Sequence, residues 1–344
     1  MSGTGILQRQ RAGRAVVAAT VVAMGVAMTG VALTNSFPTH DAETTIGPSP
    51  AGPAQDLPRT DIGWSPLTAL TLVDPRDHGA IAGDGVDDSN ALQAAIDHLG
   101  ASGGLVYFPD GQLFEIHHSL RLAQDHVKLW SPSGNGGVAQ LDGPEAGQHA
   151  ILCDETDGCG FFGLRMEAEA SRRLDSLLDH QITLDGAVNS EILGNDISGS
   201  AATGIFVFGG SENTRIVGNY VHHTWADGIH FTDGSRQAHV WRNVMYNEAP
   251  TLGDDGIACV TYGDAPRCRD MEWWDNLVLG NGQGRGLAVV GGERIHIHNN
   301  FVSHTAAAGI LVASESSYHT SSSSEILIER NVVYGAGQTV SHPG

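Results

Sequence analysis

The sequence has very little positive charge. Lys128 is the only lysine, and 18 basic residues face 39 acidic ones, which gives a formal net charge of −21 at pH 7. A surface of this sign repels polyanions on approach. The composition therefore argues against nucleic acid and other phosphate-bearing partners.

Cysteine is also scarce. The four cysteines form two close pairs in the sequence, Cys153 with Cys159 and Cys259 with Cys268. In an exported protein these pairs predict two short-loop disulfides, and four buried free thiols are the alternative.

The N-terminus has the features of an export segment. Three arginines precede a charge-free stretch of 19 residues from Ala15 to Leu33. This stretch is longer than a usual signal core and nearly spans a bilayer, so we favour a cleaved signal peptide and keep a membrane anchor as the alternative. We assign residues 1–35 to this segment and residues 36–71, which are rich in Pro, Gly, Ser and Thr, to a flexible linker. Either way, the rest of the chain is expected to be secreted or at the cell surface.

The second half lacks long helical periodicity and instead repeats a short motif. An asparagine has an apolar residue three positions before it and another two positions after it, and copies recur every 24 to 33 residues. The six asparagines are Asn195, Asn219, Asn243, Asn276, Asn300 and Asn331. A second series, a glycine followed by an aliphatic residue, alternates with them at Gly204, Gly228, Gly256, Gly286 and Gly309.

These two series predict a solenoid. Each repeat is a coil of three short strands, and equivalent residues of successive coils stack about 4.8 Å apart. We expect the asparagines to form an internal ladder through their amides and to adopt the left-handed backbone of a tight turn.

A short helix is expected to cover the N-terminal end of this core. Asp88 and Ser89 are predicted to cap it, and Gly100 ends it. Its apolar face repeats at helical spacing over residues 92–99, and a strand follows at residues 105–108.

Residues 77–97 and 103–109 resemble the N-terminal motif of the pectate-lyase-like superfamily. They contain the runs Gly83-Asp-Gly-Val-Asp-Asp88 and Gly103-Gly-Leu-Val-Tyr-Phe-Pro109. The resemblance implies an all-β fold, a right-handed parallel β-helix, which we assign as a catalytic domain over residues 72–340. It also implies a carbohydrate-active protein, but not which reaction.

Two coils depart from the glycine series in the same way. Thr203 and Ala308 precede the glycine in the outer coils, whereas Asp227 and Asp255 precede it in two successive inner coils. Two ionised carboxylates about 5 Å apart, at an effective dielectric constant near 20, repel by roughly 3 kcal/mol. Such a pair indicates a shared proton, a bound cation such as calcium, or an acid and a base for catalysis. We favour catalysis, and ordinary Asp-Gly turns are the structural alternative.

The surrounding runs resemble the active site of polygalacturonases of glycoside hydrolase family 28. Trp225-Ala-Asp-Gly228, Gly253-Asp-Asp-Gly256 and Gly284-Arg-Gly286 stand where that family has Asn-Thr-Asp-Gly, Gly-Asp-Asp and Gly-His-Gly. The first two runs are also similar to α-1,3-glucanases of family 87. The resemblance implies an inverting hydrolase in which Asp254 is the general acid and Asp227 and Asp255 hold and deprotonate water. We expect no cofactor and no metal in this site.

The departures from family 28 concern the substrate. Ile310-Leu-Val312 stands where polygalacturonases carry the Arg-x-Lys pair that binds uronate carboxylates. With the negative net charge, this favours a neutral or weakly charged polysaccharide. The residues that we expect to contact the sugar at this coil edge are Trp225, His230, Tyr262, Arg285 and Glu315.

Two other functions stay open. A polysaccharide lyase or uronate epimerase could use Arg285 to neutralise a substrate carboxylate, although the chain lacks the Asp-Pro-His motif of alginate epimerases. A non-catalytic surface protein could bind glycan along the solenoid. His296 and His298 share one strand face, as metal ligands do, but the sequence shows no third ligand beside them.

Overall fold

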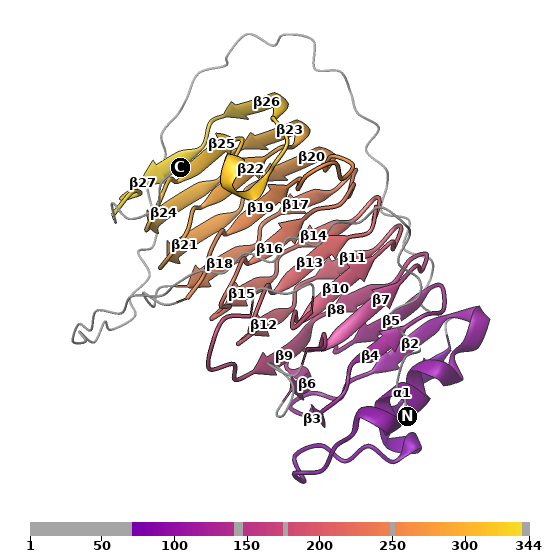
Figure 1. Ribbon diagram of the computed structural model, residues 1–344. Helices are drawn as coiled ribbons and strands as arrows, with labels where there is room; N and C mark the ends of the chain where they lie inside the picture. The colour runs from indigo at the N-terminus through magenta and orange to yellow at the C-terminus, as the bar shows by residue number, and fades with distance from the viewer. Residues whose placement is uncertain (1–70, 141–146, 175–177, 248–251, 339–344) are drawn as a thin grey trace, which may run out of the picture. The chain divides into compact units, whose positions relative to one another are not determined.

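Figure 1 shows the computed structural model of the chain, in which short strands wind into a stack of coils. The structure describes residues 71–140, 147–174, 178–247 and 252–338. The export segment and the linker expected over residues 1–71 lie outside these ranges, apart from residue 71. Within the described ranges, no helix has the length and apolar character needed to cross a bilayer.

Three parallel sheets run along the solenoid axis. Sheet A has ten strands: β1 (Leu72–Val73), β2 (Gly104–Tyr107), β5 (Val127–Trp130), β8 (Gly160–Phe162), β11 (Glu191–Leu193), β14 (Arg215–Val217), β17 (His239–Trp241), β20 (Arg269–Trp274), β23 (Glu293–His298) and β26 (Ser324–Glu329). Sheet B has nine: β3 (Leu113–Ile116), β6 (Gly136–Gln140), β9 (Leu164–Ala168), β12 (Asp196–Ser198), β15 (Tyr220–His222), β18 (Val244–Asn247), β21 (Leu277–Asn281), β24 (Phe301–Thr305) and β27 (Val332–Tyr334).

Sheet C has eight strands: β4 (Leu120–Leu122), β7 (Ile151–Asp154), β10 (Ile182–Asp185), β13 (Ile205–Phe208), β16 (Ile229–Phe231), β19 (Ile257–Val260), β22 (Leu287–Val290) and β25 (Ile310–Ala313). In every sheet each strand pairs with its equivalent in the next coil. The predicted all-β parallel solenoid is therefore confirmed.

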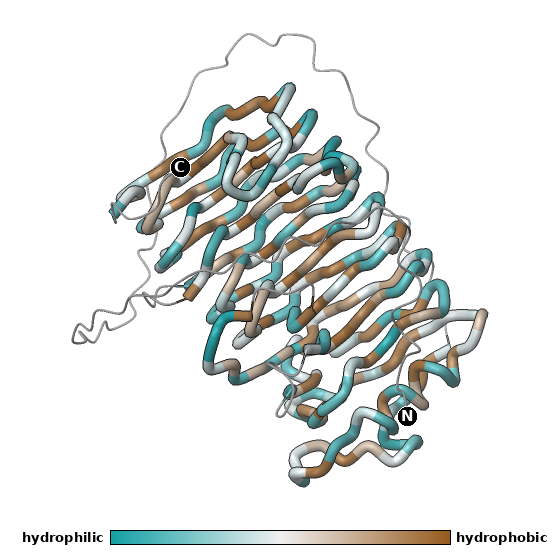
Figure 2. The backbone as a smooth tube through the Cα atoms, viewed as in Figure 1, coloured by the Kyte–Doolittle hydropathy of each residue, from teal (hydrophilic) through white to brown (hydrophobic). Residues whose placement is uncertain are grey.

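The apolar positions of the repeat build the core. Ile216, Val240 and Trp273, each three residues before a ladder asparagine, are completely buried, and so are Val221 and Val278, each two residues after one. Figure 2 shows the resulting alternation of hydrophobic and hydrophilic segments along the coils. A strand with period-two alternation turns one set of side chains inward, and each fully buried aliphatic side chain contributes about 1.5–3 kcal/mol.

The six asparagines form a continuous ladder, as predicted. From Asn195 to Asn331, each side-chain amide donates to the carboxamide oxygen of the next copy at 2.8–3.0 Å. The expected left-handed backbone at these asparagines is wrong. The residue before each of them has the positive φ, for example Gly194 at 65° and Arg242 at 56°. The preceding residue thus makes the turn, and the asparagine is left to point its amide inward.

Helix α1 (Ser89–His98) lies at the N-terminal end of the solenoid (Figure 1). Leu92 and Ile96 on its inner face are fully buried in the core. The predicted capping is wrong in detail, because the Asp88 carboxylate accepts from the backbone N–H groups of Ile81 and Glu115 instead of from the helix. The helix therefore begins next to a carboxylate that fastens the entry loop to the first coils. Three 3-10 helices complete the described elements: η2 (Pro75–His78), η3 (Gly100–Ser102) and η4 (Ser316–Tyr318).

Both cysteine pairs are bonded, Cys153 to Cys159 and Cys259 to Cys268. The first cysteine of each pair lies in a sheet C strand, and the second lies directly before a sheet A strand. Each disulfide therefore closes the turn from sheet C to sheet A.

Candidate active site

A row of glycines brings the coils unusually close together before sheet C. A Cβ at Gly228 or Gly256 would lie 2.6 Å from the carbonyl oxygen of the next glycine in the row. Only glycine permits this approach. The backbone N–H of Gly228 donates to the carbonyl of Asp255 at 2.9 Å, and that of Gly256 donates to the carbonyl of Arg285 at 3.0 Å. The residues that precede the glycines therefore stack in one column.

This column brings the predicted aspartates together. Its order over five coils is Thr203, Asp227, Asp255, Arg285 and Ala308, as set by the register of β13, β16, β19, β22 and β25. Asp254 lies beside it, next to Asp255. One carboxylate oxygen from each aspartate lies within 4.8 Å of those of the other two.

The three aspartates differ in their access to solvent. The Asp254 side chain is 26% exposed, whereas those of Asp227 and Asp255 are 10% and 3% exposed. The Asp254 carboxylate is therefore the member of the cluster that is most accessible from solvent. The cluster thus has one carboxylate toward solvent and two behind it.

Asp255 is held by a buried ion pair. Arg285 donates from Nε to Oδ1 at 2.7 Å and from Nη2 to Oδ2 at 2.8 Å, and its Nη1 donates to Glu315 at 2.5 Å. Burial raises the pKa of Asp255 to about 7, and the Arg285 charge opposes that rise. An arginine does not give up its proton in a protein, so buried Arg285 needs both carboxylates as counter-charges. The charge on Asp255 therefore depends on Arg285.

Asp227 is also fixed by donors. His230 approaches it at 2.5 Å from Nδ1 to Oδ2, and the backbone N–H of Asp255 donates to Oδ1 at 2.6 Å. His230 is itself buried. His230 therefore orients the Asp227 carboxylate, and its contact with a sugar stays a prediction.

Asp254 has a partner that the sequence did not indicate. Arg173, which lies in the segment after β9, donates from Nη2 to Oδ2 of Asp254 at 2.9 Å. The Asn281 side chain donates a hydrogen bond to the backbone carbonyl of Asp254. Gly284 packs against the same oxygen so closely that a Cβ at this position would lie only 1.8 Å from it. Three carboxylates, those of Asp254, Asp255 and Glu315, thus bond two guanidinium groups.

The predicted sugar contacts fall into two groups. Arg285, Glu315 and His230 bond the aspartates or one another, as described above. Trp225 is half-buried, and its indole N–H donates to the carbonyl of Ala170 at 2.9 Å, which fastens the segment that carries Arg173. Tyr262 keeps an exposed ring, and its pKa is raised by partial burial and then by the charges of the three aspartates. The charges of the cluster thus act on Tyr262, and its contact with a sugar stays a prediction.

Two groups of side chains among the described residues could hold a metal ion. One is the aspartate cluster, where a cation would compete with Arg173 and Arg285 for the same carboxylates. Because Asp254 and Asp255 are already paired with arginines, a proton shared among the carboxylates fits the cluster better than a metal ion does. The other group is Glu272, His296 and His298, on sheet A.

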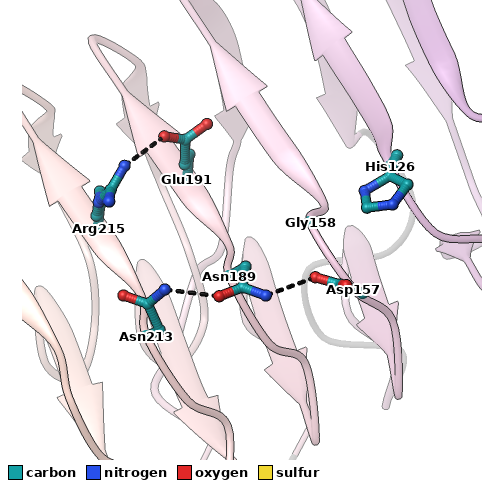
Figure 3. Close-up of a pocket in the computed structure, with 7 residues that line it drawn as sticks. All are labelled: His126, Asp157, Gly158, Asn189, Glu191, Asn213 and Arg215. Carbon is teal, nitrogen blue, oxygen red and sulfur yellow. Dashed lines mark hydrogen bonds and ion pairs between the residues drawn. The ribbon is translucent and has the colours of Figure 1, made fainter. Parts of the chain in front are cut away.

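A hollow of about 350 Å³ lies elsewhere, where turns enter sheet A. In Figure 3 its side chains bond one another across coils, with Asn189 joining Asp157 to Asn213, and Arg215 paired with Glu191. The cluster residues Asp227, Asp254 and Asp255 do not line this hollow. We therefore regard it as part of the scaffold.

The comparisons with known proteins agree with this architecture. A family model described as a right-handed β-helix region matches residues 173–333. No curated protein matches the sequence. With the three parallel sheets, the match defines the solenoid as a right-handed parallel β-helix.

Solved structures with the same fold include several carbohydrate-active enzymes. The catalytic unit of a family 87 α-1,3-glucanase from Streptomyces thermodiastaticus is 22% identical with a TM-score of 0.64, and the match covers 76% of this chain and 47% of that one. An exopolygalacturonase from Thermotoga maritima is 14% identical with a TM-score of 0.59, and 76% of each chain is covered. A mannuronan C-5 epimerase module from Azotobacter vinelandii is 17% identical with a TM-score of 0.52, covering 78% of this chain and 77% of the module.

The chain thus spans about half the length of the glucanase structure. The predicted likeness to polygalacturonases and to family 87 is confirmed at the level of the fold. At identities of 14–22%, these similarities show a shared fold and not a shared reaction.

Proposed function

We propose that this protein is a glycoside hydrolase that cuts a neutral or weakly charged polysaccharide. The observation that supports it most is the stack of Asp227, Asp254 and Asp255, with oxygens within 4.8 Å of one another and one carboxylate open to solvent. Ion-pair scaffolds do not need three adjacent acids. A hydrolase can use them, because it needs at least one carboxyl group to donate a proton and another to activate water.

The exposures support the division of roles. The general acid has to reach the glycosidic oxygen of a polymer, which favours Asp254 as the exposed member. The base has to hold a water molecule, which favours the buried pair Asp227 and Asp255. His230 and Arg285 are positioning residues in this scheme, because they fix the two carboxylates without touching the substrate.

We further propose that the reaction inverts the anomeric centre, with water bound between the acid and the base pair. The nearest oxygens, within 4.8 Å, are closer than the roughly 6.5–9.5 Å between carboxyl groups in most inverting enzymes. Stereochemistry therefore needs its own measurement. Proton NMR of the first product formed distinguishes the two anomers before they interconvert. The anomer opposite to the substrate linkage supports inversion, and the same anomer overturns it.

The substrate class follows from charge. The net charge is −21, and by the sequence resemblance Ile310-Leu-Val312 stands where polygalacturonases carry their uronate clamp. Arg285 is no substitute for that clamp, because Asp255 and Glu315 already occupy its donors. A neutral glucan is thus favoured over pectin, and the likeness to an α-1,3-glucanase makes α-glucans the first to test. We place this activity outside the cytoplasm, where such polymers occur.

A panel of neutral and acidic glycans tests the proposal. The expected result is new reducing ends on a neutral glucan, without an ultraviolet-absorbing unsaturated sugar. An unsaturated product would assign a lyase, and a changed uronate without chain cleavage would assign an epimerase. Binding without any product across the panel would assign a glycan-binding surface protein. Each of the last three results overturns the hydrolase.

A further inference from the structure

The outward face of sheet A carries two histidines and a glutamate close together near the C-terminal coils. His296 and His298 are two residues apart on β23 and so point to the same side, and Glu272 of β20 pairs with His296 in the register. One ligand atom from each of the three lies within 4.8 Å of the other two. We call Glu272, His296 and His298 the His-Glu cluster. The sequence did not show the third ligand because Glu272 lies one coil earlier.

The spacing of the cluster is close to that of a metal site. Glu272 Oε1 lies 2.9 Å from His298 Nε2 and 3.9 Å from His296 Nδ1. Ligand atoms bonded to Zn²⁺ at about 2.0–2.2 Å in a tetrahedron are about 3.3 Å apart. The two observed distances bracket that value, so small side-chain rotations bring all three atoms onto one ion.

Neighbouring side chains fix the ligands as an outer shell would. Glu329 Oε1 lies 3.2 Å from His296 Nε2, which leaves Nδ1 facing the cluster. The ring of His298 is parallel to that of Trp274, with centroids 6.1 Å apart, and Trp274 stacks on Trp241 at 4.8 Å. Carboxylates behind ligating histidines and packed rings beside them both hold a metal site in shape.

We propose that the His-Glu cluster binds one first-row transition metal ion, with Zn²⁺ as the best match, and that the ion ties β20 to β23. Two imidazoles and a carboxylate suit Zn²⁺, whereas Ca²⁺ and Mg²⁺ take oxygen ligands. The charges of Glu272 and Glu329 balance a divalent ion. His239, whose Nδ1 is 3.7 Å from Glu272 Oε2, or a water molecule completes the shell. This site is independent of the proposed hydrolase.

The position of the cluster suggests what the ion does. Glu272, His296 and Glu329 lie on three consecutive strands of sheet A, β20, β23 and β26. The core positions of the β20 and β23 coils, such as Trp273 and Ile297, are fully buried. The ion would therefore add a cross-link on the outer face of two coils that already pair along their backbones.

Metal titration of the full chain tests the site. The protein is stripped with EDTA, dialysed, and titrated with zinc sulfate by calorimetry. A parallel titration with Co²⁺ follows the visible absorption band of the bound ion. The expected result is one ion per chain at micromolar concentration, with a rise of several degrees in the thermal midpoint. A chain that gives neither binding heat nor a Co²⁺ band overturns the proposal.

Variants locate the ion. Glu272→Gln and His298→Phe keep the shape of the side chains and the ring stacking, yet each should abolish binding. Glu329→Gln should weaken it by about 10–100-fold, as for other outer-shell partners. His98→Ala, at an exposed histidine of α1, is the matched control and should bind as the wild type does. Binding that survives in both ligand variants, or that disappears in Asp254→Asn instead, contradicts the assignment.

Discussion

Replacing Arg285 by leucine removes the guanidinium that holds Asp255 and Glu315 in the candidate site. Breaking a buried ion pair from one side costs about 3–5 kcal/mol when the carboxylate stays charged. Asp255 escapes much of this cost by taking up a proton. Loss of a neighbouring arginine raises a carboxyl pKa by about 1–3 units. Starting from a pKa of about 7 for Asp255, its ionised fraction at pH 7 falls from about a half to about a tenth or less.

The proposed base works only when it is ionised. Activity therefore rises with pH through the pKa of Asp255, and the acidic limb of the profile lies near pH 7 in the wild type. In Arg285→Leu this limb should move to higher pH by about 1–3 units, so that activity lost at pH 7 returns in alkaline buffer. The assay is kcat/KM for glycan hydrolysis between pH 5 and 10.

Two variants control this experiment. Arg285→Lys keeps the charge but loses the two-point contact with Asp255. The acidic limb of its pH profile should therefore lie between those of the wild type and Arg285→Leu. Arg76→Leu removes an exposed arginine paired with Asp74, and it should change stability little and leave the profile unchanged. An acidic limb of Arg285→Leu that coincides with the wild type would refute the reasoning.

Two further predictions concern the site and the scaffold. His230→Leu removes the donor that fixes Asp227, so kcat should fall by roughly 100-fold with little change in KM, as measured by initial rates; a change confined to KM would instead make His230 a sugar contact. Asn243→Ala deletes the five hydrogen bonds of the Asn243 side chain, so urea unfolding should show a loss of about 3 kcal/mol or more. Asn331→Ala, at the end of the ladder, should lower the free energy of unfolding clearly less. Equal losses in the two variants would contradict a ladder whose inner members contribute most of the stabilisation.

The repeat made much of this structure predictable. In a parallel stack the register follows the repeat, so an asparagine or a glycine at a fixed place in each coil stacks on its own copies. That is why the ladder could be predicted, and why Asp227 could be placed beside Asp255 from positions 28 residues apart. The residue with the left-handed backbone could not be predicted as well. Both Gly194 and Arg242 adopt it, because the turn selects a position and not a residue type.

The partners of the aspartates were harder to predict. Arg173 reaches Asp254 from an irregular segment 81 residues earlier, which the repeat does not describe. Glu315 lies in another such segment, and its pairing with Arg285 was not predicted. Glu272 is inside the repeat, but its closeness to His296 and His298 becomes visible only when the coils are stacked. A sequence repeat therefore predicts which residues stack on one another in successive coils. The contacts that the connecting segments make can be seen only in the folded structure.

The most direct test of the catalytic cluster is the turnover of Asp254→Asn on the glycan that the wild type cleaves. Removing the proton donor should lower kcat by about 10²–10⁴-fold, with an unchanged thermal midpoint. Asp97→Asn, at an exposed aspartate of α1, should keep wild-type turnover. Near-wild-type turnover by Asp254→Asn would contradict a hydrolase that works through this cluster.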